Sequence, residues 1–366
     1  MAHLILAVTN DLASDQRMHR IATTLRQAGH EVTLVGRQLP DSPPAGDRTY
    51  ATHRFRLFFS KGKLFYLEYN WRLFWHLLRR RPDLITSNDL DTLLAGYLAS
   101  RLLRRPLVYD SHEYFTEVPE LIHRPLTRRI WLALERWIFP KLTHVYTVSE
   151  SIRAVYADTY GVKVELVRNL PFRRPAPELA EKPPLLMYQG ALNVGRGLEL
   201  MIAALVYLPE YRLAIAGRGD IAHQLAGIAR THGVAERVTL IGHLAPDELA
   251  RHTARARYGL SLEEDLGANY RFALPNKVFD YIQARVPVIV SDLPEMRSVV
   301  ENWGVGTILD SEARTPQGLA AHIRAMEASG KYQKWVTAAD RAAATLCWEQ
   351  EEKTLLDVYH QALRRN

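Results

Sequence analysis

Short apolar runs alternate with amphipathic segments along the first half of the chain. Residues 15–29 predict a helix, because Ile21, Leu25 and Ala28 recur at helical spacing and Gly29 is a typical stop signal. The strand-like apolar runs cover residues 4–10, 31–36, 84–87, 106–112 and 144–149. Strands that alternate with helices predict a parallel sheet wound on both faces.

The same alternation starts again after a proline-rich segment. Residues 171–184 hold five prolines, and proline removes backbone donors and fixes φ, so this segment continues neither a helix nor a central strand. Further strand-like runs follow at residues 185–190, 211–217, 237–242, 258–262, 287–292 and 306–310. We therefore expect an N-terminal domain over 1–172, a linker over 173–184, a C-terminal domain over 185–346 and a final helical segment over 347–366 that packs back toward the N-terminal domain.

Length and cysteine content agree with this division. A chain of 366 residues suits two α/β domains better than a single core. The lone Cys347 excludes an internal disulfide and a zinc site built from several cysteines. No apolar run is long enough to span a membrane, and the first residues read as a buried strand rather than a signal peptide. These features predict a cytoplasmic protein, which could act at the inner face of the membrane.

The positive charge is concentrated in the first half of the chain. Residues 1–182 hold 27 Lys and Arg against 19 Asp and Glu, a balance of +8, whereas residues 183–366 hold 20 against 21, a balance of −1. A basic half can attract an anionic membrane surface, an acidic acceptor or nucleic acid, and it can equally be a solvated, arginine-rich surface. Since the sequence contains no recognised nucleic-acid-binding module, we expect no nucleic acid partner.

Aromatic and basic residues are mixed within residues 53–81, where Glu68 is the single acid. This combination suits a membrane interface or a lipid-linked acceptor. The alternative is an amphipathic helix that faces the core and keeps its arginine stems outside.

The most specific block is residues 274–292, LPNKVFDYIQARVPVIVSD. Here the sequence resembles the family 4 (group 1) glycosyltransferases, in particular bacterial members with a Pro-Asn-Lys-x-Phe-Asp/Glu-Tyr segment before a Pro-Val-Ile strand. Residues 188–205, 213–220, 238–244 and 348–359 fit the same family. The resemblance covers the C-terminal half and, more loosely, the N-terminal half. It implies the GT-B fold, an α/β class with two Rossmann-like doubly wound domains that face a central cleft.

The loop at residues 190–197 predicts a diphosphate site. Gly190, Gly195 and Gly197 let a backbone approach a ligand closely, and the following helix offers free N–H groups. By the resemblance, Arg196 takes the place of the family's phosphate-binding lysine, and Lys277 is the candidate for a second cation. An arginine that often follows the first glycine of this loop is Ala191 here. The alternatives are an exposed loop arginine and a surface lysine.

The resemblance implies further contacts to the donor. Asp280 would accept hydrogen bonds from the ribose hydroxyls, since a carboxylate can bind two vicinal hydroxyls. Asn276 belongs to the same segment, and Gly217 and Arg218 would lie beside the nucleotide base. Where many relatives carry a first glutamate this chain has Phe272. Upstream, residues 263–265 are all acidic and could compensate, but we expect a solvated acidic turn.

In the N-terminal half, His112 matches the family's histidine and would contact the donor sugar or orient the acceptor, because imidazole titrates near neutral pH. The alternative is a buried, hydrogen-bonded histidine. The end of the first strand is polar and predicts acceptor binding through Asn10, Asp11, Asp15 and Arg17. Asp15 could equally cap the following helix. Residues 88–91, Asn-Asp-Leu-Asp, follow a strand in the same way, and one of these acids could also be a cap.

Together these features predict a glycosyltransferase that moves a sugar from a UDP- or GDP-linked donor to a sugar, lipid-linked or other glycan acceptor. The resemblance implies retention of the anomeric configuration, no metal, no cofactor beyond the nucleotide sugar, and a role in glycan, cell-envelope or exopolysaccharide synthesis. Two alternatives stay open. A sugar-nucleotide 2-epimerase of the same fold would convert a UDP-sugar without an acceptor, and a non-catalytic GT-B-like scaffold would bind a donor without turnover.

Overall fold

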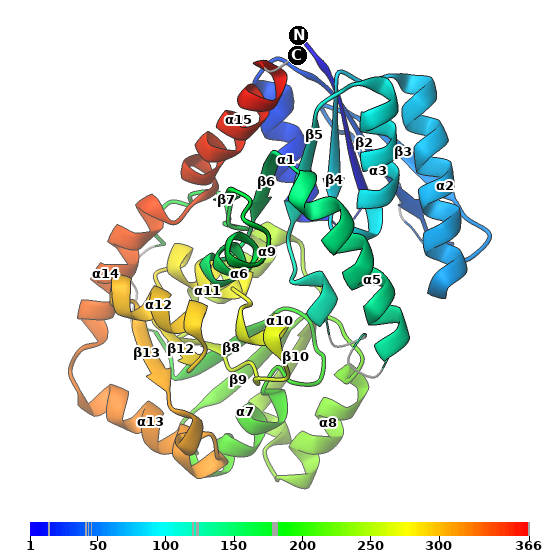
Figure 1. The fold of residues 1–366 in the computed structure, drawn as a ribbon. Helices are drawn as coiled ribbons and strands as arrows, with labels where there is room; N and C mark the ends of the chain where they lie inside the picture. The colour runs from blue at the N-terminus through cyan, green and yellow to red at the C-terminus, as the bar shows by residue number, and fades with distance from the viewer. Residues whose placement is uncertain are drawn as a thin grey trace. The chain divides into compact units, whose positions relative to one another are not determined.

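The chain forms two compact units in a computed structural model that describes residues 1–13, 15–40, 42, 44, 46–118, 121, 124–177 and 182–364. Unit 1 comprises Met1–Asn169 and Glu351–Asn366, and unit 2 comprises Leu170–Gln350. Figure 1 traces the chain, whose N-terminal strand and C-terminal helix both belong largely to unit 1. Residues 178–181 of the segment predicted as a linker lie outside the described residues.

Unit 1 is built on a parallel sheet with the strand order β3-β2-β1-β4-β5-β6-β7. Its strands are β1 (His3–Asp11), β2 (Glu31–Gln38), β3 (Ala51–Arg56), β4 (Leu84–Asn88), β5 (Leu107–Ser111), β6 (His144–Thr147) and β7 (Val164–Leu166). Its helical segments are α1 (Gln16–Gln27), α2 (Gly62–Arg80), α3 (Leu90–Leu103), η1 (Phe115–Glu117), α5 (Pro125–Ile138), η2 (Phe139–Lys141), α6 (Glu150–Tyr160) and most of α15 (Trp348–Arg364).

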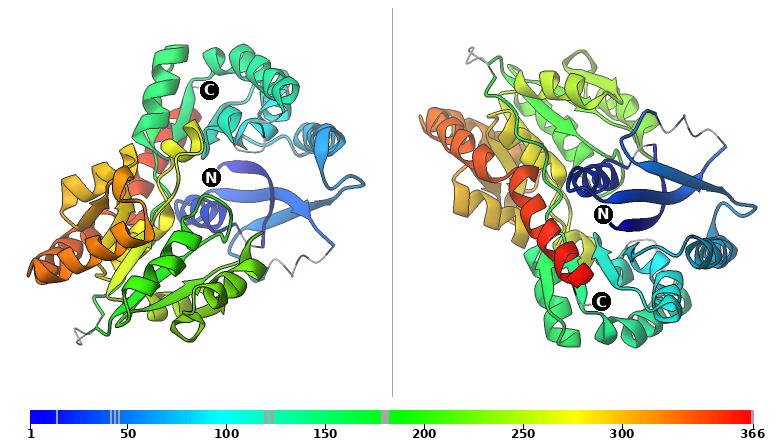
Figure 2. Two further views of the ribbon diagram at one scale, coloured as in Figure 1. Left: turned by 90° about the horizontal axis from the view of Figure 1, so that it is seen from below. Right: turned by 90° about the horizontal axis from the view of Figure 1, so that it is seen from above.

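The helices cover both faces of this sheet. Helices α1 and α15 lie on one face, and α2, α3 and α5 lie next to one another on the other (Figures 1 and 2). The central strands β4 and β5 are buried along their whole length. Burial on both faces explains why these strands read as continuous apolar runs rather than as alternating ones.

The segment at residues 53–81 is not one amphipathic helix. Its first residues belong to the strand β3, and α2 begins only at Gly62. Helix α2 does bury one stripe, formed by Phe65, Tyr69, Leu73 and Leu77. The alternative of a helix that packs on the core therefore applies to residues 62–80 only.

Unit 2 repeats the architecture with the strand order β10-β9-β8-β11-β12-β13, again all parallel. Its strands are β8 (Leu185–Gln189), β9 (Arg212–Ala216), β10 (Val238–Gly242), β11 (Tyr258–Ser261), β12 (Val288–Ser291) and β13 (Gly306–Leu309). Its helical segments are α7 (Leu198–Ala204), η3 (Leu205–Tyr207), α8 (Ala222–Thr231), η4 (Ala235–Arg237), α9 (Pro246–Ala254), α10 (Ala268–Arg271), α11 (Asn276–Gln283), α12 (Pro294–Trp303), η5 (Ser311–Ala313), α13 (Pro316–Ala328) and α14 (Tyr332–Thr345).

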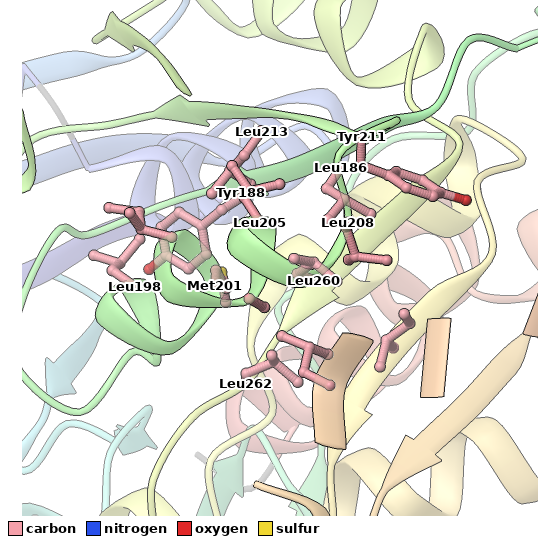
Figure 3. Packing of buried hydrophobic residues seen from close by; sticks show 14 of the residues in the cluster. Leu186, Tyr188, Leu198, Met201, Leu205, Leu208, Tyr211, Leu213, Leu260 and Leu262 are labelled. Atoms are coloured by element: carbon pink, nitrogen blue, oxygen red, sulfur yellow. The ribbon is translucent and has the colours of Figure 1, made fainter. Parts of the chain in front are cut away.

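Two apolar layers hold unit 2 together, one on each face of its sheet. The first joins β8, β9 and β11 to α7, α8 and α13, and includes Leu186, Tyr188, Met201, Leu213 and Leu260 (Figure 3). The second joins the other face to α11, α12 and α14. This doubly covered parallel sheet fixes the carboxyl ends of β8, β9 and β11, where the loops predicted to bind the donor begin.

None of the helices within the described ranges combines the length and the apolarity needed to cross a bilayer.

Candidate functional site

A buried ion pair marks the carboxyl end of β11 in unit 2. Glu263 follows this strand and is fully buried, and its Oε1 lies 2.5 Å from Nζ of Lys277 on α11. Ser261 donates a second hydrogen bond to Oε2 of Glu263 at 2.7 Å. The Lys277 ammonium also lies 4.4 Å from the ring centre of Tyr188. Lys277 is therefore a buried, positioned cation rather than a surface lysine.

Arg196 reaches the same carboxylate from the glycine loop. Its Nη1 lies 3.7 Å from Oε1 of Glu263, and its guanidinium lies 5.0 Å from the ring centre of Tyr270. Within the described residues, the buried Nε of Arg196 has no hydrogen-bond partner. The structure thus brings Arg196 and Lys277 together around one acid, with one buried N–H of Arg196 unpaired among the described residues.

Charge and burial compete in this cluster. Burial alone would raise the pKa of Glu263, but the neighbouring Lys277 ammonium outweighs it and holds this pKa below its ordinary value. Burial lowers the pKa of Lys277, while Glu263 opposes that shift. Because one carboxylate faces two cations, the ionised side chains of Glu263, Lys277 and Arg196 together carry a net charge of +1, while the Asp280 carboxylate also acts on Lys277.

Gly195 and Gly197 of the predicted loop, and Gly217 after β9, are required first by contacts within the protein. A Cβ on Gly217, whose φ is 149°, would lie 1.8 Å from the carbonyl oxygen of Gly190. A Cβ on Gly197 would lie 2.4 Å from the carbonyl oxygen of Leu262. Gly195 also has positive φ and packs against Leu266. The structure thus gives a reason for these glycines that differs from the close ligand approach we expected.

Gln189 at the end of β8 holds Asp280. Its Nε2 donates to Oδ2 of Asp280 at 2.8 Å, and its own Oε1 accepts from Thr253 at 2.5 Å. Asn276, the first residue of α11, is exposed. The side chain of Arg218 is exposed as well, and its backbone carbonyl accepts from the N–H of Leu192 at 2.8 Å.

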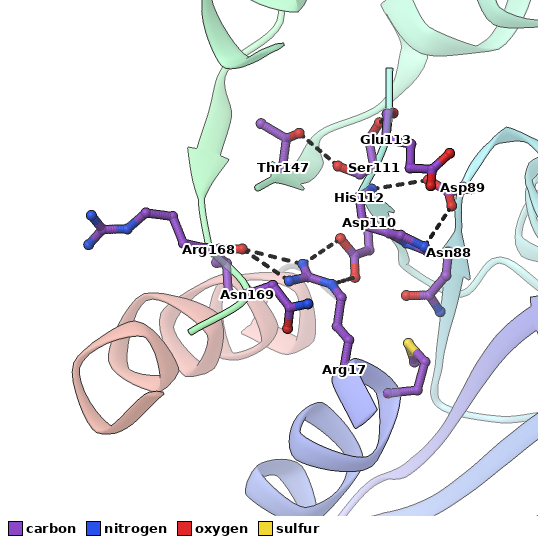
Figure 4. Close-up of polar contacts among 12 residues, drawn as sticks. Arg17, Asn88, Asp89, Asp110, Ser111, His112, Glu113, Thr147, Arg168 and Asn169 are labelled. Atoms are coloured by element: carbon purple, nitrogen blue, oxygen red, sulfur yellow. Dashed lines mark hydrogen bonds and ion pairs between the residues drawn. The ribbon is translucent and has the colours of Figure 1, made fainter. Parts of the chain in front are cut away.

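In unit 1, His112 is held by Asp89. The two oxygens of Asp89 accept from the backbone N–H of His112 at 3.0 Å and from its Nε2 at 3.0 Å (Figure 4). Asp89 precedes α3 but makes no side-chain cap to it, so the capping alternative does not apply to Asp89. Its positive φ of 56° is uncommon outside glycine. Within the described residues, Nδ1 of His112 is buried without a hydrogen-bond partner.

The acids around His112 change its titration. Burial alone would lower the pKa of His112, but Asp89, with Asp110 and Glu113, raises it to about 10. Asp91, buried nearby on α3, accepts a 2.5 Å hydrogen bond from Thr9. Burial, reinforced by the charge of Asp89, raises the pKa of Asp91 to about 7. His112 is therefore a cation at neutral pH, which corrects the expectation that it titrates there.

The structure removes Arg17 from the predicted acceptor-binding residues. Its guanidinium points from α1 to Asp110 at the end of β5, with N–O distances of 2.8 and 3.1 Å, and it also donates to the carbonyl of Val167 (Figure 4). Arg17 and Asp110 are 5% and 0% exposed. Because its donors are used inside the protein, Arg17 stabilises unit 1 instead of facing an acceptor.

The other predicted acceptor-binding residues also have internal partners. Asp15 caps α1 by accepting from the N–H of Met18 at 3.0 Å, so the capping alternative is the one the structure shows. Asp11 accepts hydrogen bonds from the backbone N–H of Ala13 and the hydroxyl of Ser42. Asn10 is exposed and donates to Asp15 at 3.1 Å. Of these side chains, Asn10 is the most accessible to an acceptor.

Two family models cover most of the chain. Residues 15–170 match the model described as Glycosyltransferase Family 4, and residues 171–342 match the one described as Glycosyl transferases group 1. The chain belongs to the group 1 glycosyltransferases. The expected enzyme class and family are thereby confirmed.

One curated relative of this glycosyltransferase is a GDP-mannose:cellobiosyl-diphosphopolyprenol alpha-mannosyltransferase from Xanthomonas campestris. It is 23% identical over 305 residues, which cover 78% of this chain and 75% of the relative.

Similar solved structures show the fold. Sucrose-phosphate synthase from Thermosynechococcus elongatus is 16% identical, with a TM-score of 0.82 and 100% of both chains covered. Anabaena HepE in complex with UDP and glucose is 16% identical, with a TM-score of 0.75 and coverage of 98% of this chain and 100% of HepE. These structures confirm the predicted GT-B class of two Rossmann-like domains.

Two residues of the glycosyltransferase's clusters were not assigned a role from sequence. Glu263 was expected in a solvated turn, which is wrong because it is buried between two cations. The available signal was its place directly after a buried strand, two residues from Ser261. Asp89 carried a similar signal after β4.

In the described part of the chain, no group of three or more His, Cys, Asp and Glu side chains is arranged to hold a metal ion.

Proposed function

We propose that this glycosyltransferase binds a nucleotide diphosphate sugar through unit 2 and transfers the sugar with retention of its anomeric configuration. The observation that carries the proposal is the convergence of Arg196 and Lys277 on the buried Glu263, beside the glycine loop. A preformed cationic cluster at the carboxyl end of a parallel sheet suits a diphosphate.

The transfer reaction is favoured by positive charge beside the leaving group. When the bond between the anomeric carbon and the phosphate oxygen breaks, negative charge builds on the departing nucleoside diphosphate. A fixed cation there stabilises the transition state more than the ground state. We propose that Arg196 and Lys277 supply this charge without a divalent metal, and that the nucleotide sugar is the only small molecule required besides the acceptor.

Glu263 tunes this cluster. It keeps Lys277 charged in a buried position, at the cost of neutralising one of the two cations. Arg196 is 25% exposed and more distant from Glu263, so it can turn toward a diphosphate while Lys277 stays in place. Asp280, oriented by Gln189, would accept from the ribose hydroxyls.

In unit 1, protonated His112 would donate from Nδ1 to the transferred sugar or to the acceptor. The names of similar proteins mention GDP-mannose with a diphosphopolyprenol-linked acceptor, and UDP with glucose. We therefore propose a UDP- or GDP-linked hexose as donor. A lipid-linked glycan of the cell envelope or an exopolysaccharide is the proposed acceptor, reached by an enzyme that works at the inner face of an anionic membrane.

Thermal shift with a panel of UDP- and GDP-sugars tests the donor site. We expect one donor to raise the unfolding temperature of the wild type, and Arg196→Ala and Asp280→Ala each to abolish that rise. Arg230→Ala, which removes an exposed arginine from α8 of the same unit, is the matched control and should keep it. An unchanged rise in both site variants would show that the donor binds elsewhere.

Retention and metal independence are tested on the enzyme while it catalyses the transfer. With the donor from the panel and a soluble glycan acceptor, we expect NMR of the product to show the donor's anomeric configuration and EDTA to leave the rate unchanged. An inverted product, or activity lost with EDTA and restored by a divalent ion, would contradict the respective part of the proposal.

A further inference from the structure

One side of unit 1 exposes many large apolar residues. It comprises the outer surfaces of α2, α3 and α5 with the loop before α2, and we call it the α2–α3–α5 face. Trp71 and Leu67 on α2 are 62% and 68% exposed, and Phe58 in the loop is 88% exposed. The full set is Phe58, Phe59, Leu64, Leu67, Trp71, Trp75, Leu98, Leu102, Leu126, Ile130 and Trp137. An apolar surface spread over three neighbouring helices indicates an interaction site.

The acids of these three helices are buried or held by neighbouring groups. Each helix contains one acid. Asp91 on α3 and Glu135 on α5 are buried. The side chain of Glu68 on α2 is 12% exposed and is occupied by the backbone N–H groups of Phe58 and Phe59 and by Arg72. The outer surfaces of the helices therefore carry no exposed carboxylate.

Their exposed charges are all positive. Lys63, Arg79, Arg80, Arg101, Arg129 and Arg136 are exposed on the same helices. Some cations lie over the exposed rings, with Arg72 5.3 Å from the ring centre of Phe58 and Lys141 4.8 Å from that of Trp137. Aromatic rings with cationic side chains beside them are typical of surfaces at the boundary between lipid and water.

Two hollows on these helices are lined in the same way. One, of about 890 Å³, lies between α2 and β3 and is lined by His53, Phe55, Trp71, Arg72, Trp75, His76, Arg79 and Arg80. The other, of about 440 Å³, lies at the end of α3 and includes Arg101, Arg104, Arg105 and Lys141. Of the described residues that line either hollow, none is acidic. Such hollows suit phosphate groups.

We propose that the α2–α3–α5 face docks the enzyme on an anionic lipid bilayer, with Trp71, Leu67 and Phe58 inserted among the headgroups and the arginines on lipid phosphates. Basic residues near an anionic surface contribute about 1 kcal/mol each, and the buried apolar area adds to this. Charge complementarity favours this occupant over a neutral partner, and the leucines and tryptophans favour it over nucleic acid, which offers them no apolar surface. This inference rests on the proposed lipid-linked acceptor, and it assigns the contact with the membrane to one surface of the protein.

Vesicle flotation tests this surface. The purified full chain is mixed with vesicles of phosphatidylcholine alone or with 30% phosphatidylglycerol. We expect the wild type to bind the anionic vesicles and to leave the neutral ones largely unbound. Leu67→Ala with Trp71→Ala should weaken the binding at least about tenfold, because the inserted apolar area is lost. Arg79→Glu with Arg80→Glu should do the same, and more strongly at low salt.

Val206→Ala with Leu240→Ala removes exposed apolar residues from unit 2 and is the matched control, which should bind like the wild type. Failure of the wild type to bind anionic vesicles would overturn the proposal, as would equal binding by the Leu67/Trp71 variant. A dimer that forms without lipid and is lost in that variant would assign the face to a second copy instead. All variants should keep the thermal shift with donor, so a lost donor site and a lost membrane site are distinguishable.

Discussion

The two units differ in the balance of charge at the carboxyl ends of similar sheets. In unit 2, Arg196 and Lys277 surround the single carboxylate of Glu263. In unit 1, Asp89, Asp91 and Asp110 stand against His112 and Arg17, and because the pKa of Asp91 is raised to about 7, the charge of this cluster lies between neutral and −1 at neutral pH. Both clusters are buried, and both link neighbouring strand ends.

The difference shows that the fold determines where a site lies, whereas its side chains determine which ligand it can bind. A cluster with net positive charge suits a diphosphate. A cluster whose acids already raise the pKa of His112 suits hydroxyl groups and a fixed proton donor. Two sites with these different preferences are what a transfer between a charged donor and a polyhydroxyl acceptor requires.

The largest effect is expected when the acid of unit 2 is removed. Glu263→Gln leaves the buried Lys277 ammonium without a carboxylate, and we expect unit 2 to lose about 3–5 kcal/mol of unfolding free energy. Urea unfolding, followed by tryptophan fluorescence, measures the loss. Asp265→Asn, whose acid is partly exposed in a surface pair with Arg271, is the control and should change stability by less than about 1 kcal/mol. Equal effects would mean that the buried pair has no special role.

Backbone contacts between the loops of unit 2 come next. Gly217→Ala puts a Cβ into the carbonyl of Gly190, and we expect it to cost about 2–4 kcal/mol and to weaken donor binding. Gly227→Ala is the matched substitution on α8, where a Cβ meets nothing within 4 Å, and should stabilise by about 0.5–1 kcal/mol. If both alanine substitutions changed the free energy of unfolding equally, the loop would be able to move far enough to relieve the 1.8 Å contact, and the role of Gly217 would be contradicted. Urea unfolding and donor thermal shift measure both.

A smaller effect, on the pH dependence of the transfer rate, is expected when Asp89 of unit 1 loses its charge. Asp89→Asn should preserve the backbone, because asparagine has the same size and branching as aspartate, but it removes the charge that keeps His112 protonated. In the wild type, the transfer rate should stay level from about pH 6.5 to 9, since the pKa of His112 is about 10. In the variant, the rate should fall above about pH 7 as the imidazole loses its proton. A pH–rate profile unchanged by the substitution would contradict this role.

The stability of unit 1 should follow the same titration. The pKa of His112 is raised by folding from 6.5 to about 10, so the stabilisation is fully present below pH 6.5 and is lost as the pH rises toward 10. Asp89→Asn should remove that slope in urea unfolding between pH 6.5 and 10. A merely structural role of Asp89 would lower stability equally at every pH.

The buried strands and the edge strands β10 and β13 of unit 2 could be predicted from the sequence, whereas the two edge strands of unit 1 could not. The strands β4, β5, β11 and β12 are buried on both faces and therefore appear as apolar runs. The missed strands β3 and β7 form the two edges of the sheet of unit 1. Strand β3 mixes polar and apolar residues and β7 is only three residues long, so neither has the apolar run that β10 and β13 have.

The site could be predicted only in part for a similar reason. Motif and loop position led to Arg196, Lys277 and His112, because each follows a strand or belongs to a recognised segment. Their partners Glu263 and Asp89 are set by packing between separate strands, 14 and 23 residues away along the chain. Likewise, the pairing of Arg17 with Asp110 spans 93 residues, and no local pattern predicts it.

The terminal helix has a consequence for how the enzyme is made. Unit 1 is completed by α15, where Tyr359 and Thr86 share a buried hydrogen bond of 2.9 Å and Glu351 pairs with Arg168. Between Asn169 and Glu351 the ribosome must synthesise all of unit 2, which takes roughly 10–40 s at about 5–20 residues per second. During that interval the first sheet emerges with one of its covering helices still unmade, so a chaperone that shields the exposed side of β4 would meet this protein during translation rather than after release.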